Sequence, residues 1–367
     1  MGLGDLIQRN EPVQISSNQV WKSVSCGLTH TLALTLDGKM WGWGLNGNGQ
    51  CGLGEISQSN TPLPVDTTHT YVQISCGASH TLAIRSDSTL WSFGFNGNGE
   101  LGSGYTEDSM YPILIDSISK WVEVSGGFSF SLARKDDGTI WSWGFNGNGQ
   151  LGLGNTIQQN SPTQIGTNSN WLYINAGSSY CFAINENNEL FGWGYNGLGQ
   201  LGIPVSTTQS SPVQIGNETD WFYISGAKGY AYNGTLYGNH SIGIRSTLNN
   251  LCATGANYIG QLGNNTLVAT SAFNCNIGSV DVENFSQETH SVTLFPNPSS
   301  DMVTVNINKD NYQTYSYRLF DMNGKLVLES KIMEPNFKID VSTYPKGIYF
   351  LLLENGLESY KEKIIVQ

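Results

Sequence analysis

The chain repeats itself every 50 residues. The segment WGWGLNGNGQ at Trp41–Gln50 returns as Trp91–Glu100, as Trp141–Gln150 and as Phe191–Gln200, and a degenerate fifth copy ends at Gly263. An aromatic residue opens each unit, at Trp21, Tyr71, Trp121, Trp171 and Trp221. A repeat of this length indicates an architecture in which each unit is one supersecondary module and neighbouring modules share a core.

Each unit predicts about four short antiparallel strands. The runs that begin at Thr31 and Met40 alternate in polarity, and they lie beside Asp37-Gly38 and Asn46-Gly47. Both dipeptides are typical of two-residue hairpins, whose central residues need positive φ. A sheet of four strands cannot bury both of its faces alone, whereas units arranged radially cover one another. We therefore predict an all-β chain that forms a β-propeller of four-stranded blades.

The repeat resembles a known family. The string G-x-x-H-T-L-A-L, then D-G, then W-G-W-G-x-N-G-x-G-Q-L-G is similar to the regulator of chromosome condensation repeat over residues 1–278. That family usually closes a ring of seven blades, and this sequence shows five full units. Gly2–Asp5 and Glu11–Ile15 match the second half of a unit, so the sequence starts in mid-repeat, as a truncated gene would. From this mid-repeat start we expect one or two further blades and a signal peptide upstream.

The charge balance argues against some partners. The chain has 29 acidic and 17 basic residues, which gives a net charge of −12. Binding to DNA or RNA draws on clustered Lys and Arg, and an anionic membrane attracts the same residues. Nucleic acid is therefore excluded as an expected partner. No apolar run approaches the roughly 18 residues of a membrane helix, so no membrane span is expected.

The pattern changes near the C-terminus. Residues 279–291 (SVDVENFSQETHS) carry no repeat signature and are interpreted as a linker. Turn dipeptides such as Asn323-Gly324 and Asn355-Gly356 then separate short apolar runs, which predicts a small immunoglobulin-like sandwich. The seven expected strands are 291–295, 302–307, 315–321, 326–331, 337–340, 347–353 and 359–366.

Residues 292–367 carry a second resemblance. The motifs FPNP at 295–298, DMNGK at 321–325, YPKGIY at 344–349 and the ending KEKIIVQ are similar to the C-terminal sorting domain of type IX secretion cargo in Bacteroidetes. The resemblance implies a partner in the type IX machinery, export through the outer membrane, and a protein that is secreted or displayed on the cell surface. The residues that it marks as the sorting signal are Pro296, Asn297, Pro298, Gly324, Gly347, Tyr349, Lys361 and Lys363.

The histidines are the first candidates for chemistry. His30, His80 and His240 occupy matching positions and could together ligate a metal. The two intervening units carry Phe130 and Tyr180 there, and a position that accepts an aromatic ring is more typical of packing or strand capping. The sequence also lacks G-x-S-x-G, H-E-x-x-H and an evident acid/base pair. We expect no catalytic residue, no metal and no cofactor.

The chain has six cysteines: Cys26, Cys51, Cys76, Cys181, Cys252 and Cys275. Cys51 stands where other units have Leu, and Cys26 and Cys76 share a position with Gly126 and Ala176. Small or apolar buried positions suit free cysteine, so free thiols are favoured. A bridge between Cys252 and Cys275, which both lie in the irregular last unit, is left open.

One insertion interrupts the repeat. The step from Trp221 to His240 is 19 positions, against nine from Trp21 to His30, so ten residues are added around 227–239. The insertion is rich in Tyr, Gly and Asn, which are the residues of adaptable recognition loops. Two interpretations stay open: a solvated hairpin or edge-covering flap, and a partner-binding site built from Tyr230, Tyr232 and Tyr237.

These features favour a non-catalytic propeller that is exported and binds an extracellular protein or glycan through its loops. The family resemblance suggests one alternative, guanine nucleotide exchange on a small GTPase, which an exported protein would not meet. A second alternative is an extracellular enzyme that uses the propeller channel. It would need two or more carboxylates that converge with a histidine, and the repeat positions supply no such set.

Overall fold

The computed structural model divides the chain into two compact units, Met1–Ser279 and Val280–Gln367. The structure describes all residues except 16–18, 207, 230, 233–234, 237, 247–249, 276–291, 298, 308–314, 322–324, 333–335, 355–358 and 367. For strand residues 231–232, 235–236, 250, 293, 315, 332 and 359–361 only the backbone is described. The described residues form strands, turns and loops without a helix, and no segment among them qualifies as a membrane-spanning helix.

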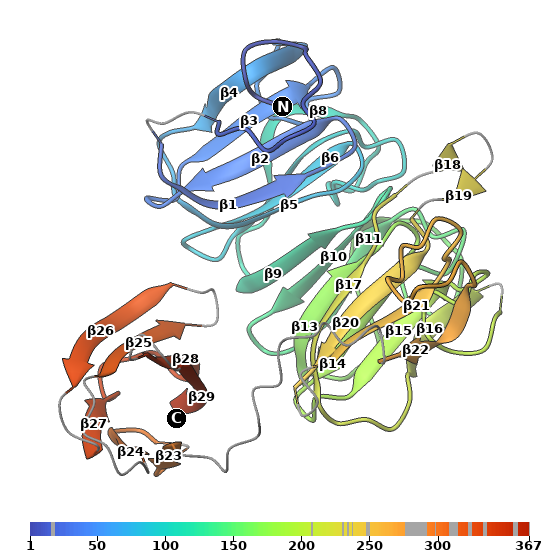
Figure 1. Cartoon of the computed structure of the whole chain (residues 1–367). Helices are drawn as coiled ribbons and strands as arrows, with labels where there is room; N and C mark the ends of the chain where they lie inside the picture. Colours follow the sequence, from blue (N-terminus) through green and yellow to red (C-terminus); the bar gives the residue numbers. More distant parts are fainter. Residues whose placement is uncertain are drawn as a thin grey trace. The chain divides into compact units, whose positions relative to one another are not determined.

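The first unit consists of five antiparallel four-stranded sheets, called blades one to five here (Figure 1). Each takes one repeat, as predicted. Blade one contains β1 (Trp21–Cys26), β2 (His30–Thr35), β3 (Met40–Leu45) and β4 (Gln58–Asp66). Blade two contains β5 (Tyr71–Cys76), β6 (His80–Arg85), β7 (Leu90–Gly94) and β8 (Ser109–Asp116). Blade three contains β9 (Trp121–Gly126), β10 (Phe130–Lys135), β11 (Ile140–Gly144) and β12 (Gln159–Gln164).

The last two blades follow the same strand order. Blade four contains β13 (Trp171–Ala176), β14 (Tyr180–Asn185), β15 (Leu190–Tyr195) and β16 (Thr208–Gln214). Blade five contains β17 (Trp221–Gly226), β20 (His240–Arg245), β21 (Asn250–Gly255) and β22 (Thr270–Asn274). The insertion adds a small hairpin of β18 (Ala231–Tyr232) and β19 (Thr235–Leu236) between its first two strands.

The cores of this unit lie between successive blades. Leu32, Leu34 and Met40 of blade one pack against Tyr71 and Ile74 of blade two, and all five are buried. Equivalent clusters join the later blades in turn. Each sheet therefore removes apolar surface from water only by contact with its neighbours, which is the reason for predicting a radial arrangement.

One of the two predicted hairpin turns is wrong. Asp37-Gly38 joins β2 to β3, and Gly38 has φ of +78° as expected. Asn46-Gly47 instead opens the long loop of residues 46–57 between β3 and β4. Asn46 is fully buried; its amide donates to the carbonyls of Gly54 (3.1 Å) and Ile56 (2.7 Å) and its Oδ1 accepts from Cys51 N (2.8 Å). The side chain of the asparagine, together with its backbone bonds to Ser57 O and Gly49 N, holds this connection.

The N-terminal segment takes the place of the end of a repeat. Gly2 lies against the ring of Trp43, as Gly102 lies against Trp143, and Gly4 N donates to Asn60 O at 2.8 Å. One face of β1 is open. Val24 is 64% exposed, whereas Val124 at the same position of blade three is 3% exposed.

The second unit is a two-sheet sandwich. One sheet has the order β23 (Val292–Phe295), β24 (Met302–Ile307), β27 (Asn336–Asp340). The other has the order β26 (Leu326–Ile332), β25 (Tyr315–Asp321), β28 (Gly347–Glu354), β29 (Ser359–Val366). Inward residues of both sheets, such as Val303, Val305 and Leu351, are fully buried in one core. All seven predicted strands are confirmed to within one residue at each end. Strands such as β24, β27 and β28 alternate between core and solvent, which is the pattern that a sequence displays.

Candidate functional site

The buried histidines tie neighbouring blades together. His30 Nε2 of blade one lies 3.2 Å from Thr81 Oγ1 of blade two, and Thr81 Oγ1 donates back to Gln50 O of blade one at 2.8 Å. Since the hydroxyl proton of Thr81 goes to Gln50, His30 Nε2 must be the donor to Thr81. These two hydrogen bonds together fix one neutral tautomer of the imidazole, with the proton on Nε2.

The same tie joins blades two and three. His80 Nε2 lies 3.0 Å from Ser131 Oγ, which donates to Glu100 O at 2.7 Å. Burial lowers the pKa of His30 to about 4 and that of His80 to about 3, so both rings stay neutral. This arrangement corresponds to the packing role predicted for the position. Among the residues that the structure describes, no three His, Cys, Asp or Glu side chains gather as metal ligands.

Lys228, at the start of the insertion, reaches across the first unit. Its Nζ donates to Cys76 O of blade two at 3.0 Å, and burial lowers its pKa. It lines a cavity of about 40 Å³ together with residues at and just after the ends of β1, β5 and β9: Cys26, Gly27, Leu28, Gly77, Ala78, Gly127 and Phe128. Of the tyrosines predicted to bind a partner, Tyr230 and Tyr237 and the side chain of Tyr232 lie outside the described residues, and β18 and β19 form a hairpin there.

The cysteines divide into two kinds. Cys252 and Cys275 form the bridge that the sequence left open, and the four other cysteines are free, as predicted. Cys51 and Cys76 are buried, and burial raises their thiol pKa to about 12 and about 11. Such thiols are inert packing groups rather than nucleophiles.

A carboxylate partners the opening aromatic residue of blades two and three. Asp66, five residues before Tyr71, accepts from the Tyr71 hydroxyl at 2.9 Å. Asp116, five residues before Trp121, accepts from the Trp121 indole Nε1 at 3.2 Å. We call this the carboxylate position; it is occupied by Asp66, Asp116, Gly166 and Gly216 in successive repeats.

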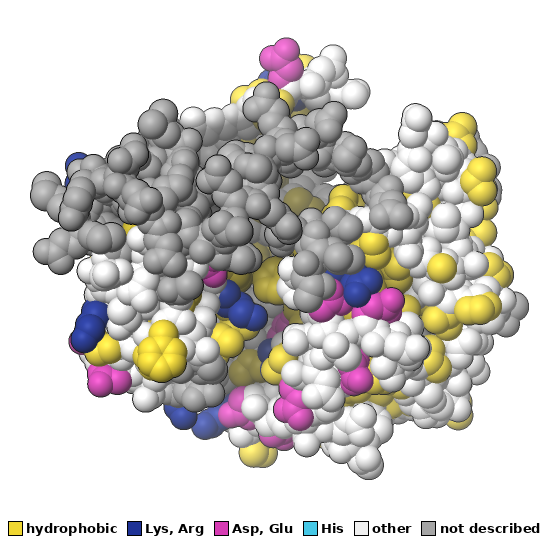
Figure 2. Space-filling view, turned by 60° about the horizontal axis from the view of Figure 1, so that its bottom comes forward, with side chains coloured by type: hydrophobic (Ala, Val, Ile, Leu, Met, Phe, Trp, Pro, Cys, Tyr) yellow, Lys and Arg dark blue, Asp and Glu magenta, His cyan; other side chains and the backbone are white. Residues whose placement is uncertain are grey.

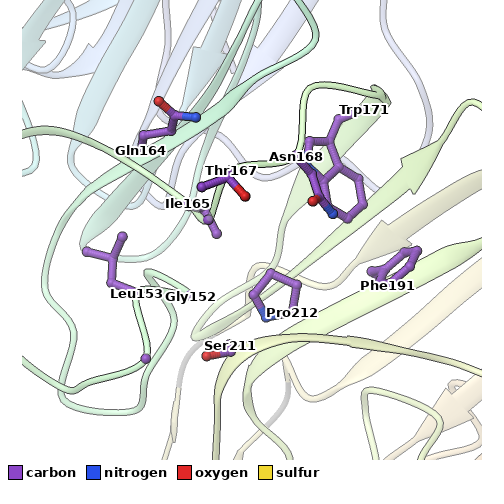
Figure 3. Close-up of a pocket in the computed structure, with 12 residues that line it drawn as sticks. Gly152, Leu153, Gln164, Ile165, Thr167, Asn168, Trp171, Phe191, Ser211 and Pro212 are labelled. Carbon is purple, nitrogen blue, oxygen red and sulfur yellow. The ribbon is translucent and has the colours of Figure 1, made fainter.

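Blade four has lost this carboxylate, and a cavity opens in its place. Gly166 stands five residues before Trp171, whose Nε1 is buried and has no hydrogen-bond partner among the described residues. The cavity has a volume of about 390 Å³ (Figure 3). It is lined by Gly152, Leu153, Gly154, Gln164, Ile165, Gly166, Thr167, Asn168, Trp171, Phe191, Ser211 and Pro212.

Sequence reasoning missed this cavity. The signal was present, because a comparison of the aligned repeats shows Asp at 66 and 116 and Gly at 166 and 216. Its meaning depends on a geometric fact, namely that the indole N–H of Trp121 reaches Asp116. Figure 2 shows a face on which basic and acidic side chains lie beside one another.

A family model for the RCC1-like domain matches residues 1–232. The chain belongs to the RCC1-like domain family. Human WBSCR16 is 19% identical to this RCC1-like chain with a TM-score of 0.65, over 95% of this chain and 89% of that one. Yeast RCC1 (Prp20), in its structure with Kap60 bound, is 18% identical with a TM-score of 0.59, over 95% and 81%. These likenesses show the propeller fold, and no curated protein sequence shows significant similarity.

The tail of the RCC1-like chain matches a second model, the secretion system C-terminal sorting domain, over residues 293–367. The protein is therefore type IX cargo of the Bacteroidetes kind, secreted or displayed on the cell surface. In this domain Asn297 pins the FPNP segment to the last strand: its Oδ1 accepts from Ile365 N at 2.8 Å and its Nδ2 donates to Lys363 O. The exposed side chains of Pro296, Asn297 and Lys363 thus lie at one edge of the sandwich.

The other predicted sorting residues have different places. Gly347 begins β28, and Tyr349 is buried and donates from its hydroxyl to Pro345 O at 2.8 Å. Pro298 and Gly324 lie outside the described residues, as does the side chain of Lys361.

Proposed function

We propose that this RCC1-like chain is a non-catalytic binding module that the type IX machinery exports and that recognises an extracellular protein or glycan through its loops. The observation that carries the proposal is how the repeated polar groups are used. His30 and His80, each through Nε2, and the buried asparagines of the long loops form hydrogen bonds within and between blades. Recognition is then left to positions where the blades differ from one another.

Export is assigned to the sandwich, with residues 279–291 as the linker before it. The edge formed by Pro296, Asn297 and Lys363 is proposed as the surface that the machinery reads, since its side chains are exposed and Asn297 is hydrogen-bonded to the backbone of the last strand. The chain, supplied with a signal peptide, would be expressed in a bacterium with a type IX system, beside a version that lacks 292–367. Whole-cell protease accessibility is expected for the intact chain and retention in the periplasm for the shortened one. Equal surface display of both would refute the assignment.

Binding by the insertion is tested separately. Replacing Tyr230, Tyr232 and Tyr237 by Ala is expected to abolish capture of the extracellular partner from spent culture medium and to leave the melting temperature unchanged. A variant that loses its fold instead would support the hairpin interpretation of the insertion, and capture that is unchanged would remove these tyrosines from the proposal.

A further inference from the structure

We propose that blades three and four bind a neutral polysaccharide on the end that carries the side chains of Phe128, Phe145 and Tyr195. We call this end the aromatic face. It consists of Tyr195 and the connections that follow β9, β11, β13 and β15, which are residues 127–129, 145–158, 177–179 and 196–206. This inference rests on the proposed binding function and names the ligand class and the place.

The three aromatic residues stand on one hydrogen-bonded stretch of backbone. Phe145 N donates to Ser129 O at 2.9 Å, and Ser129 follows Phe128 in the chain. Phe128 N donates to Ser178 O of blade four at 3.1 Å, and Tyr195 N makes the bond within blade four that Phe145 makes within blade three. The main chain beneath the rings is therefore fixed across the boundary between two blades before a ligand arrives, which lowers the entropy cost of binding.

Glycines in the same connections make room for two of the rings. The tip of the Phe145 ring takes the space that a Cβ on Gly147 would need, and the Tyr195 ring does the same at Gly197. The glycines of these Asn-Gly pairs thus set the position of a ring instead of a hairpin. Phe128 and Phe145 remain 36% and 38% exposed, so both present ring surface to the solvent.

Neutral polar groups are available on the same face. The Asn148 amide and the Tyr195 hydroxyl are partly exposed, and neither makes a side-chain hydrogen bond with another described residue. In blades one and two the equivalent amides of Asn48 and Asn98 donate to carboxylates instead. Sugar hydroxyls both donate to and accept from amides and hydroxyls. The C–H groups of a pyranose ring also pack against the electron-rich face of an aromatic ring.

The aromatic face carries no charge. None of its residues is Asp, Glu, Lys or Arg, whereas the connections at the other end of the same blades hold four acidic residues at 136–137 and 186–189. Lys228, which shares a small cavity with Phe128, turns its ammonium to Cys76 O in blade two. A charged ligand would therefore find no complementary partner on this face, and protein partners usually add such charges at the rim of an interface.

The ligand is a polymer because the face offers open surface rather than enclosure. The cavity at Phe128 has a volume of about 40 Å³, little more than the roughly 30 Å³ that one water molecule takes up, so it cannot enclose a sugar. One sugar on an open surface would bury little area. A chain of sugars contacts rings of both blades at once, and linked contacts raise the affinity without enclosure.

Affinity electrophoresis of the full chain tests the proposal. Native gels contain a neutral polymer (hydroxyethylcellulose, mixed-linkage β-glucan, galactomannan or dextran) or an anionic one (alginate or polygalacturonate). At least one neutral polymer is expected to retard the chain in a saturable way. Phe128→Leu/Phe145→Leu keeps apolar volume and removes the ring faces, and it is expected to weaken that binding by about fivefold or more.

Leu172→Ala/Phe222→Ala is the matched control, because these residues begin the inner strands at the opposite end and are 53% and 48% exposed. It is expected to bind within about twofold of the original chain. Asn148→Ala is expected to weaken binding by about threefold, from one lost hydrogen bond. Thermal denaturation checks that each variant is folded, and Asn148→Ala decides the question if the double leucine variant is not.

Retardation by none of the four neutral polymers would overturn the proposal, and so would stronger retardation by the anionic ones. Binding that the leucine and Asn148 variants leave unchanged, or that the control pair weakens equally, would overturn the assignment to the aromatic face. If the leucine variant loses capture of a protein from spent medium while no polymer retards the chain, the face is a protein interface. That result would overturn the polysaccharide and leave the proposed binding function standing.

Discussion

The imidazole of His30 donates to the hydroxyl of Thr81, which lies in the next blade and 51 residues further along the chain, at 3.2 Å. The Thr81 hydroxyl in turn donates a hydrogen bond to Gln50 O of the first blade. One hydrogen bond therefore runs from the first blade to the second, and the other runs from the second blade back to the first. This arrangement depends on a neutral ring, since burial lowers the pKa of His30 to about 4.

This relationship predicts a pH dependence of stability. In the unfolded chain the histidines titrate near pH 6.5, whereas in the folded chain burial lowers the pKa of His30 to about 4 and of His80 to about 3. Between pH 6.5 and about 4 the unfolded state therefore binds more protons, and the free energy of unfolding falls as the pH falls. The loss is about 1.4 kcal/mol per pH unit for each ring, and the full contribution is present above pH 6.5.

Urea denaturation of the chain and of His30→Phe/His80→Phe, measured from pH 7.5 to 4.5, checks this prediction. Phe is the residue that blade three already carries at this position, as Phe130. All carboxylates remain in the variant, so the difference between the two curves isolates the imidazoles. The variant is expected to have the shallower slope, and two parallel curves would show that the rings do not titrate as buried groups.

The repeat and the strand order were predictable because they depend on local alternation and on period, which a single sequence displays. The hydrogen bonds inside the long loops were not. Asn-Gly favours a two-residue hairpin in isolation, but Asn46 is followed by a loop whose carbonyls converge on its amide. The cavity at Trp171 was missed for a related reason: the loss of a carboxylate at Gly166 is visible in the letters, but the group left without a partner is visible only in space.

The role of the buried asparagine can be tested within one loop. Asn146 is fully buried; its Nδ2 donates to Asn155 O and Ile157 O, both at 3.0 Å, and its Oδ1 accepts from Leu151 N at 3.0 Å. Asn146→Ala leaves these buried groups unpaired and is expected to lower the free energy of unfolding by about 2–4 kcal/mol. Thermal and urea denaturation measure the loss.

Asn148 provides the control for that variant. It lies two residues further along, its side chain makes no hydrogen bond with another described residue, and the next blade carries Leu198 at this position. Asn148→Ala is expected to change the free energy of unfolding by less than about 0.5 kcal/mol. Equal effects of the two substitutions would mean that the loop is not held by the Asn146 amide.

The open face of the first blade predicts that a valine-to-alanine substitution there changes the free energy of unfolding less than the same substitution in blade three. Val24 and Val124 occupy the same position of β1 and β9, but their exposed fractions are 64% and 3%. Val124→Ala removes two methyl groups from the core between blades two and three and is expected to cost about 1.5–3 kcal/mol, from lost burial and the cavity left behind. Val24→Ala in the same chain is expected to cost under about 0.5 kcal/mol, because its methyl groups already contact water. Urea denaturation of both variants decides the matter, and a cost at Val24 that matches the cost at Val124 would mean that the face of β1 is covered in solution.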